Sequence, residues 1–401
     1  MPGHELIGEE EKKEIMDILE TGIFMRYEFH DERQGIYKVK EFEEAVAAYL
    51  GAGHALGVTS GSAALKVALT ALDVGPGDEV IVPAFDFIAT YEAVLEAGAI
   101  PVMADLDESL NLDPRDIERK MTHRTKAVIP VHMCGAPADI AEIMKVAAVH
   151  DLLVLEDNAQ ALGGSWQGKK LGTFGNMGIL SFDYYKTITT GEGGMVVTNT
   201  RNLYERADWY HDHGHDHNPA VGRALEGRSF LGFNFRMNEF QGAVGLAQLR
   251  KLDYIIKEQR KNKALIKDAL GAIDGIGFRK LFDPDGDTAT FLGFNFPSED
   301  LTRTFQKALA DEGVASIYYK ENAWHYAPRW EHLIAWATAN SKQYPFRNSA
   351  YGGTVTYDVA AIPQAEDLIG RTLFMIIPVK MSDEKRDGIL GGIARASKVI
   401  G

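Results

Sequence analysis

The feature that most constrains the fold is an alternation of short apolar runs with helical segments along the first half of the chain. The runs lie at residues 54–58, 79–82, 102–105, 127–131 and 152–155, and a segment with helical character follows most of them. Short apolar runs separated by helices are typical of parallel strands that are buried on both faces of a sheet. The pattern therefore predicts an α/β fold, with a mainly parallel central sheet covered by helices.

The chain around this alternation predicts two domains. Helical periodicity at 9–20 and 38–50 places two helices before the first strand, and a long helix is expected from Glu239 to about Leu270. The C-terminal part mixes predicted strands with predicted helices, at 288–296, 314–318 and 373–377 and at 301–312 and 383–396 respectively. We therefore expect a large domain over residues 1–255 and a smaller α+β domain over residues 256–401.

Three polar or aromatic side chains follow predicted strands closely. Phe87 follows the strand at 79–82, Asp157 follows the strand at 152–155, and Lys186 follows an apolar strand at 178–182. Because ligands in α/β folds bind beyond the carboxyl ends of the strands, these side chains can converge on one site. Partial burial would lower the pKa of the lysine, and a neutral amine can form a Schiff base with an aldehyde.

A second signal follows the first strand, where Thr59-Ser60-Gly61-Ser62 leads into a helix. Free N–H groups at a helix N-terminus, together with serine hydroxyls, form a natural phosphate seat. The alternative is that Ser60 or Ser62 simply caps the helix.

The chain resembles the DegT-type aminotransferases of sugar and nucleotide-sugar biosynthesis. Five segments carry the resemblance: Thr59–Leu65, Pro83–Thr90, Glu156–Gln160, Ser181–Lys186 with the glycine-rich turn at 191–194, and Asn234–Met237. The resemblance implies a fold-type I enzyme that binds pyridoxal 5'-phosphate (PLP) and forms a homodimer with active sites at the subunit interface. It also implies an amino-acid donor, expected to be glutamate, and a carbonyl sugar as acceptor.

The same resemblance assigns roles to residues of the predicted site. Lys186 would be the catalytic Schiff-base lysine, and Asp157 would pair with the pyridine nitrogen. Phe87 would stack on the ring, and Gln160 would lie near its 3-hydroxyl. The remaining expected cofactor ligands bind the phosphate: Gly61, Ser62, Ser181 and, from the neighbouring subunit, Asn234. A related branch that removes a hydroxyl carries histidine in place of this lysine, so Lys186 favours amino transfer.

Three segments differ from the usual nucleotide-sugar enzymes, namely 131–135, 212–217 and 322–325. They resemble the transaminases that form 8-amino-3,8-dideoxy-manno-octulosonate (8-amino-Kdo) for lipopolysaccharide, which predicts 8-oxo-Kdo as the acceptor. Its carboxylate would need an arginine, and the candidates are Arg26, Arg236 and Arg329. The side chains expected to contact its hydroxyls are His213, His215, His217, Asn322, Trp324 and His325. No Cys/His pair elsewhere completes a metal site, so we expect no metal.

Other functions stay open at this point. The first alternative is a nucleotide-4-keto-6-deoxyhexose aminotransferase of the perosamine type. A second is a PLP-binding regulatory protein with little turnover. A nucleotide-dependent dehydrogenase is disfavoured, because no Gly-x-Gly-x-x-Gly turn follows the first strand.

The composition of the chain argues against some classes of binding partner. The formal net charge is -15, from 42 basic and 57 acidic residues, which argues against nucleic acid or an anionic membrane as a partner. The single cysteine, Cys134, fits a reducing compartment, and the N-terminal residues do not predict a secretory signal. We therefore expect a cytoplasmic protein.

Overall fold

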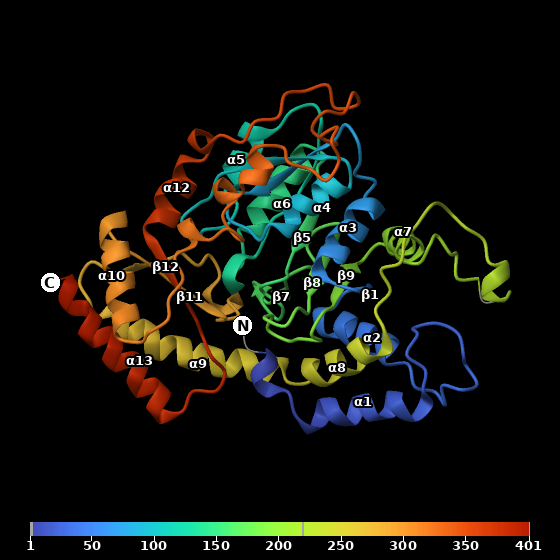
Figure 1. Ribbon diagram of the computed structural model, residues 1–401, viewed down its shortest axis with the longest axis horizontal. Helices are drawn as coiled ribbons and strands as arrows, with labels where there is room; N and C mark the ends of the chain where they lie inside the picture. The colour runs from blue at the N-terminus through green and yellow to red at the C-terminus, as the bar shows by residue number, and fades with distance from the viewer. Residues whose placement is uncertain (1–2, 219, 401) are drawn as a thin grey trace.

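A seven-stranded sheet forms the centre of the computed structural model, which describes residues 3–218 and 220–400 (Figure 1). Its strands lie in the order β1-β9-β8-β5-β4-β2-β3, and β9 alone runs antiparallel to its neighbours. Their bounds are β1 His54–Val58, β2 Glu79–Pro83, β3 Ile100–Ala104, β4 Thr125–Val128, β5 Leu153–Asp157, β8 Met177–Ser181 and β9 Gly194–Thr198. The predicted mainly parallel sheet is confirmed.

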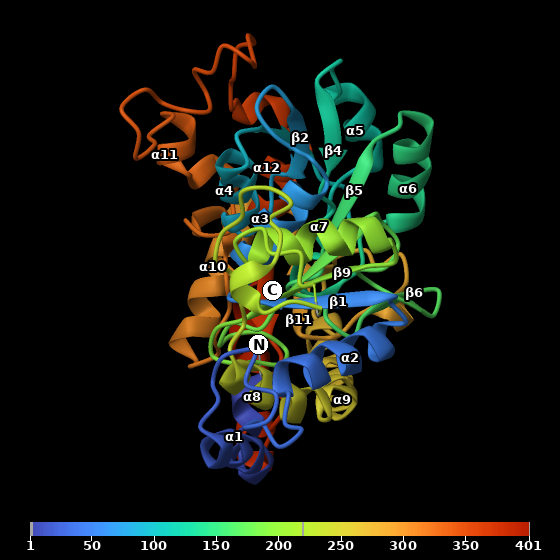
Figure 2. The same cartoon turned by 90° about the vertical axis from the view of Figure 1, so that its right-hand side faces the viewer.

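Helices cover both faces of this sheet (Figure 2). Helices α3 (Gly61–Ala71), α4 (Ala89–Glu96) and α7 (Arg201–His211) lie on one face, in a cluster that includes Val80 and Val82 of β2. Ile81 points the other way, because successive side chains of a strand alternate, and packs with α5 (Pro114–Lys120) and α6 (Ile140–Val149). Helices α2 (Lys38–Leu50) and α8 (Glu239–Leu249) cover β1, β8 and β9 on that second face, and α1 (Glu9–Thr21) packs along α8.

A second, three-stranded antiparallel sheet lies at the other end of the molecule. It contains β10 (Gly277–Phe278), β11 (Phe291–Asn295) and β12 (Thr372–Ile376), in that order. This sheet packs with α9 (Leu252–Gly271), α10 (Glu299–Asp311) and α13 (Asp383–Ala396) around its own apolar cluster, and α12 (Pro363–Gly370) leads into β12. The predicted boundary between residues 255 and 256 falls inside α9, and the division into two domains stays a prediction.

The remaining elements are short. Strands β6 (Ser165–Trp166) and β7 (Lys169–Lys170) form a hairpin, and α11 covers Glu331–Ile334. The 3₁₀ turns are Gly3–Leu6, Met133–Gly135, Arg223–Leu225, Pro284–Gly286, Tyr319–Glu321, Ala327–Arg329, Val359–Ala361 and Ser397–Val399. None of the helices in the described part of the chain has both the length and the apolar character needed to cross a bilayer.

Two predicted elements are wrong in detail. The long helix expected from Glu239 is two helices, because the helical pattern is interrupted at Arg250 and Lys251, where the Lys251 ammonium binds the carbonyl of Leu6 and the carboxylate of Glu11. The strand expected at 314–318 is reduced to one isolated bridge, between Ile317 and Phe374. Its apolar side chains serve packing rather than strand pairing.

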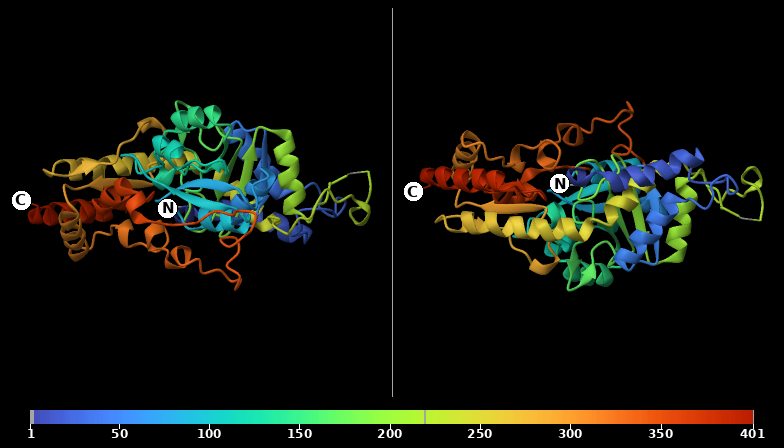
Figure 3. Two further views of the ribbon diagram at one scale, coloured as in Figure 1. Left: turned by 90° about the horizontal axis from the view of Figure 1, so that it is seen from above. Right: turned by 90° about the horizontal axis from the view of Figure 1, so that it is seen from below.

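The segment from 212 to 236, which we call the arm, projects away from the body of the molecule beyond α7 (Figures 1 and 3). It returns to the body where Asp212 pairs with Asn234 and Val58 pairs with Arg236. Asn238 then caps α8 by accepting a hydrogen bond from the N–H of Gln241 at 3.0 Å.

Candidate active site

A cavity of about 540 Å³ lies where β2, β5 and β8 end at their carboxyl termini, beside the N-terminus of α3. Side chains of the second sheet region close its other side, including Phe291, Tyr319 and Ile376. Seven of the predicted cofactor ligands line this one cavity: Gly61, Ser62, Phe87, Asp157, Gln160, Ser181 and Lys186. The convergence expected from strand ends is therefore present.

Lys186 is carried by the connection between β8 and β9. Its N–H donates to the carbonyl of Asp183 at 2.9 Å, and its own carbonyl accepts from Gly3 at 3.1 Å, so the backbone is fixed from both sides. The ammonium nitrogen lies 6.0 Å from the centroid of the Phe87 ring. Burial lowers the pKa of Lys186, although the neighbouring carboxylates of Asp157 and Asp183 oppose the shift. The predicted direction of the pKa shift is present.

Asp157 is the last residue of β5 and is 5% exposed. Its carboxylate accepts from the N–H of Ala159 at 2.9 Å and from the hydroxyl of Thr90 at 3.2 Å. Burial raises the pKa of Asp157, and the Ala159 N–H and the Lys186 ammonium offset only part of that rise. The backbone of Asp157 is also held, because His132 N–H donates to its carbonyl at 3.0 Å.

The N-terminus of α3 forms the end of the cavity that suits an anion. Ser60 caps the helix by accepting from Ala63 N–H at 3.1 Å, so the capping interpretation holds for this serine. Ser62 is exposed instead. A side chain at Gly61 would place its Cβ 2.8 Å from the Cβ of Ser181, so only glycine lets the helix start so close to the Ser181 hydroxyl. The N-terminus of this helix and the hydroxyl-bearing residues Ser62 and Ser181 thus line the same cavity.

One wall of the cavity is aromatic. The rings of Phe87 and Trp324 are 5.9 Å apart and nearly parallel, and the ring of His325 lies 5.3 Å from Phe87. Asn322 orients this wall, because its side-chain oxygen accepts from Trp324 N–H at 2.8 Å and lies 3.1 Å from Nδ1 of His325. Burial, and then the Lys186 charge, lower the pKa of His325 to about 4, so its imidazole is neutral at pH 7.

The predicted carboxylate-binding arginines lie outside the cavity of their own chain. Arg26 pairs with Glu43 at 2.5 and 3.0 Å, and Arg236 pairs with Asp212 at 2.5 Å. Arg329 is exposed on another face. Among the described residues that line the cavity, Lys186 is the only lysine or arginine. The sequence could not indicate that the guanidinium groups of Arg26 and Arg236 were already bound to carboxylates.

The histidines of the arm are also absent from the cavity lining. His215 Nδ1 lies 2.6 Å from the carboxylate of Glu226, and His217 lies 3.5 Å from Asp212. His213 binds through its backbone, to the carbonyl of Phe233 at 3.0 Å. Within residues 3–218 and 220–400, no group of three or more His, Cys, Asp or Glu is arranged to hold a metal ion.

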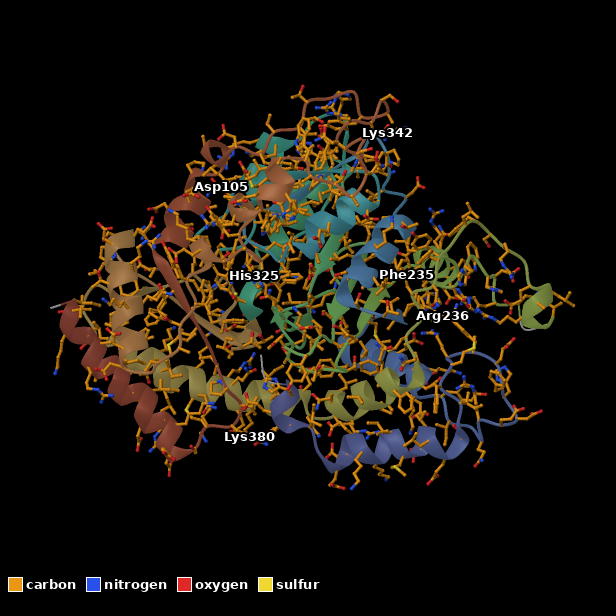
Figure 4. All side chains as sticks on the ribbon, in the orientation of Figure 1. Asp105, Phe235, Arg236, His325, Lys342 and Lys380 are labelled. Carbon is orange, nitrogen blue, oxygen red and sulfur yellow. The ribbon has the colours of Figure 1, made fainter. Side chains whose placement is uncertain are left out.

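Asp212 organises the base of the arm. Its carboxylate accepts from Arg223 at 2.6 Å and from Arg236 at 2.5 Å. Burial would raise the pKa of Asp212, but these two guanidinium groups together lower it to about 2. Arg236 lies toward the arm and away from His325 (Figure 4). Asn234, the predicted phosphate ligand from the other subunit, is exposed and does not line the cavity of its own chain.

Several lining residues were not predicted as site residues from the sequence, among them Asp86, Thr90 and Tyr319. Asp86 and Thr90 flank Phe87 within a segment already assigned to the site, so their proximity to it was the available signal. Tyr319 gave no signal, because it comes from a distant part of the chain and belongs to the site only through the packing of the second sheet region.

The cavity residues fit PLP. A buried amine of lowered pKa suits its aldehyde, a helix N-terminus with hydroxyls suits its phosphate, and the phenyl ring of Phe87 suits its aromatic ring. A buried carboxylate, Asp157, suits a protonated ring nitrogen. Each chemical group of the predicted cofactor therefore has a suitable residue in the cavity.

Comparison with known proteins gives the family. Residues 5–347 match the model of the DegT/DnrJ/EryC1/StrS aminotransferase family. The GDP-perosamine synthase of Caulobacter vibrioides is 44% identical over 216 residues, which are 54% of this chain and 57% of that protein. The spore coat polysaccharide biosynthesis protein SpsC of Bacillus subtilis is 33% identical over 399 residues, covering 97% of this chain and 94% of that protein.

The fold agrees with the same comparison. The crystal structure of 3-amino-5-hydroxybenzoic acid (AHBA) synthase superposes with a TM-score of 0.77 at 30% identity, and covers 98% of this chain and 96% of that one. The predicted fold-type I architecture is confirmed. The chain belongs to the DegT/DnrJ/EryC1/StrS aminotransferase family.

Proposed function

We propose that this protein is a PLP-dependent aminotransferase that moves an amino group from glutamate to a carbonyl sugar. The observation that carries the proposal is the meeting of Lys186 and Asp157 in one cavity, beside the anion seat at Gly61. The family implies the same cofactor and the same class of reaction. When bound, PLP supplies an electrophilic aldehyde and a conjugated ring that accepts electrons.

The protein side chains then act on protons and on orientation. The Lys186 amine, whose pKa is lowered by burial, would take a proton from the substrate carbon and return it during the second half of the reaction. Asp157 holds a proton at the ring nitrogen of the cofactor. Ser181 and the N-terminus of α3 fix the phosphate, so that the reacting atoms stay near Lys186.

The acceptor that we propose is a nucleotide-linked 4-keto-6-deoxyhexose. The similarity to GDP-perosamine synthases of Caulobacter vibrioides and Escherichia coli O157:H7 supports this class, although the matched segments cover only 57% and 64% of those proteins. The cavity also lacks an arginine among its described lining residues, which weighs against an acceptor with a carboxylate. Tyr185 and Trp324, both largely exposed at the rim, offer aromatic surface to a nucleotide outside the cavity.

The eight-carbon acid 8-oxo-Kdo is a second candidate acceptor. One observation favours it: Asn322 orients Trp324 and His325 against the cavity, and a neutral imidazole next to an amide suits a compact polyhydroxy substrate. Of the two other segments on which this candidate was based, 131–135 contributes Val131 to the cavity lining and 212–217 contributes no residue. The nucleotide sugar therefore has the stronger support.

A stepwise experiment tests these proposals. Borohydride reduction of the PLP-loaded protein should fix the cofactor on Lys186, as mapped by peptide mass spectrometry. Glutamate should then convert the bound cofactor to its amino form, followed by absorbance. A GDP-4-keto-6-deoxyhexose and 8-oxo-Kdo are each offered to that form, and return of the original absorbance identifies the acceptor. Cofactor fixed on Lys186 without any response to amino donors would favour the regulatory alternative.

We also propose that two copies of the chain build each active site. Asn234 is exposed and does not line its own cavity, and it lies at the base of an arm that extends away from the body (Figure 1). Leu225, Leu231 and Phe233 of this arm are 80%, 95% and 62% exposed, which is apolar area that a second copy would cover. Light scattering gives the mass of the assembly directly, and a monomer at working concentration would refute this proposal.

A further inference from the structure

Asp86 is a second carboxyl group in the cavity, and the reaction outlined above does not use it. It lies on the connection from β2 to α4 and is 1% exposed. Its backbone N–H donates to the carbonyl of His325 at 2.9 Å, and the N–H of Ile88 donates to Trp324 at 3.0 Å. These bonds fix the backbone on both sides of Phe87 and tie the buried Asp86 to the segment at residues 324–325.

The two oxygens of Asp86 are in different environments. Oδ1 accepts from the N–H of Phe87 at 2.6 Å. Oδ2 has no hydrogen-bond partner among residues 3–218 and 220–400, and it is inaccessible to solvent. An unpaired carboxylate oxygen in a buried site costs several kcal/mol, whereas the protonated acid is neutral and can donate a hydrogen bond.

The charged neighbours of Asp86 come from every element around it. Asp157 at the end of β5 shares the cavity, and the Thr90 hydroxyl of α4 donates to Asp157 and lies beside Asp86 as well. The charge of Lys186, on the β8–β9 connection, lowers the pKa of Asp86. The charge of Asp86 in turn raises the pKa of the Tyr91 phenol on α4. Burial and the charge of Asp157 raise the pKa of Asp86 well above its ordinary value. Two carboxyls that share a buried site repel each other when both are charged, which favours a proton on one of them.

We propose that Asp86 is a positioning residue that carries a proton on its free oxygen, so that the negative charge of the carboxyl pair stays on Asp157. The inference rests on the proposed role of Asp157 toward the ring nitrogen. A neutral Asp86 adds no further negative charge to a cavity that Asp157, Asp183 and Glu192 also line and that must accept a phosphate. It leaves Asp157, held by Thr90 and Ala159, as the charged member of the carboxyl pair.

The test makes the same substitution at each of the two carboxyls. Asp86→Asn copies the shape and neutrality of the protonated acid, and its amide oxygen still accepts from Phe87 N–H. Infrared difference spectra of the cofactor-free protein at pH 7 should show loss of a protonated-carboxyl band in Asp86→Asn and loss of a carboxylate band in Asp157→Asn. Asp105→Asn is the control, because its buried carboxylate already accepts from Leu106, Gln364 and Ala365 and should lose only a carboxylate band.

PLP affinity provides the second readout. Asp86→Asn should bind PLP within about threefold of wild type, and Asp157→Asn should bind about tenfold more weakly or worse. A carboxylate band lost in Asp86→Asn, or an affinity loss equal at the two positions, would overturn the inference. Failure of borohydride to fix PLP on Lys186 would instead refute the proposed function, and the infrared comparison would still decide where the proton lies.

Discussion

Replacing Arg26 by methionine should destabilise the fold and leave acceptor recognition intact. Arg26 forms a two-pronged ion pair with Glu43, and both side chains are 9% exposed. Glu43 also accepts from the N–H of Gly57 at 2.5 Å, which ties α2 to β1. Burial alone would lower the pKa of Arg26, but the Glu43 carboxylate, together with Tyr27 and Asp208, raises the pKa. The guanidinium is therefore committed to this pair.

The size of the stability loss follows from the buried Glu43 carboxylate that Arg26→Met leaves without its partner. The substitution keeps the apolar stem but leaves a buried carboxylate with one backbone donor, and such a loss costs about 3–5 kcal/mol. Adding Glu43→Gln removes that stranded charge while its amide oxygen still accepts from Gly57 N–H. The double variant should therefore recover most of the loss and lie about 1–2 kcal/mol below wild type.

Urea unfolding of the cofactor-free protein at a fixed protein concentration measures these free energies. Arg329→Met is the control, because this arginine is exposed, and it should change the free energy of unfolding by about 0.5 kcal/mol or less. The KM for the acceptor is then measured for each variant under conditions in which that variant is folded. A wild-type unfolding midpoint for Arg26→Met together with a raised acceptor KM would refute the structural role and restore Arg26 as a substrate ligand.

Further predictions concern the site and the arm. Lys186→Ala should still bind PLP, but without fixation by borohydride and without transamination; full turnover in this variant would exclude the assignment. Asp157→Asn should slow the half-reaction with glutamate roughly a hundredfold, corresponding to ~3 kcal/mol of lost stabilisation, and an unchanged rate in stopped-flow absorbance would contradict its role. Mixed dimers of Lys186→Ala and Asn234→Ala should regain activity above either parent, because one site keeps both native residues; no recovery in proven heterodimers would mean that each site lies within one chain. The ion pairs of Asp212 should stabilise the folded protein fully at pH values above 3.8, the ordinary pKa of its carboxyl. About 2 kcal/mol of this stabilisation should be lost as the pH falls toward about 2. Asp212→Asn should remove that pH dependence in acid unfolding, and an identical acid limb in wild type and variant would contradict it.

Local sequence patterns were enough to predict the sheet and the centre of the site. Strand alternation and strand-end positions led to Phe87, Asp157 and Lys186, because the carboxyl ends of parallel strands meet at one edge whatever their distance in sequence. Such patterns could not predict which side chains contact one another. Nothing near Arg26 in the sequence indicates that Glu43 binds it, and nothing near Tyr319 indicates that it reaches the cavity. Both contacts arise from packing between distant elements.

The hydrogen bonds from Asp86 to His325 and from Ile88 to Trp324 have a consequence for how the protein matures. Each bond joins two positions separated by more than half of the chain, and such distant contacts are the slowest to form. A growing chain can assemble the parallel strands and the Lys186 turn while residues 324 and 325 are still unsynthesised. Until those residues arrive, the Phe87 side of the cavity lacks its wall and its apolar surface is open to water. A chain truncated before Trp324 should therefore acquire its strands but bind chaperones in place of PLP, so cofactor capture belongs to the last stage of biogenesis.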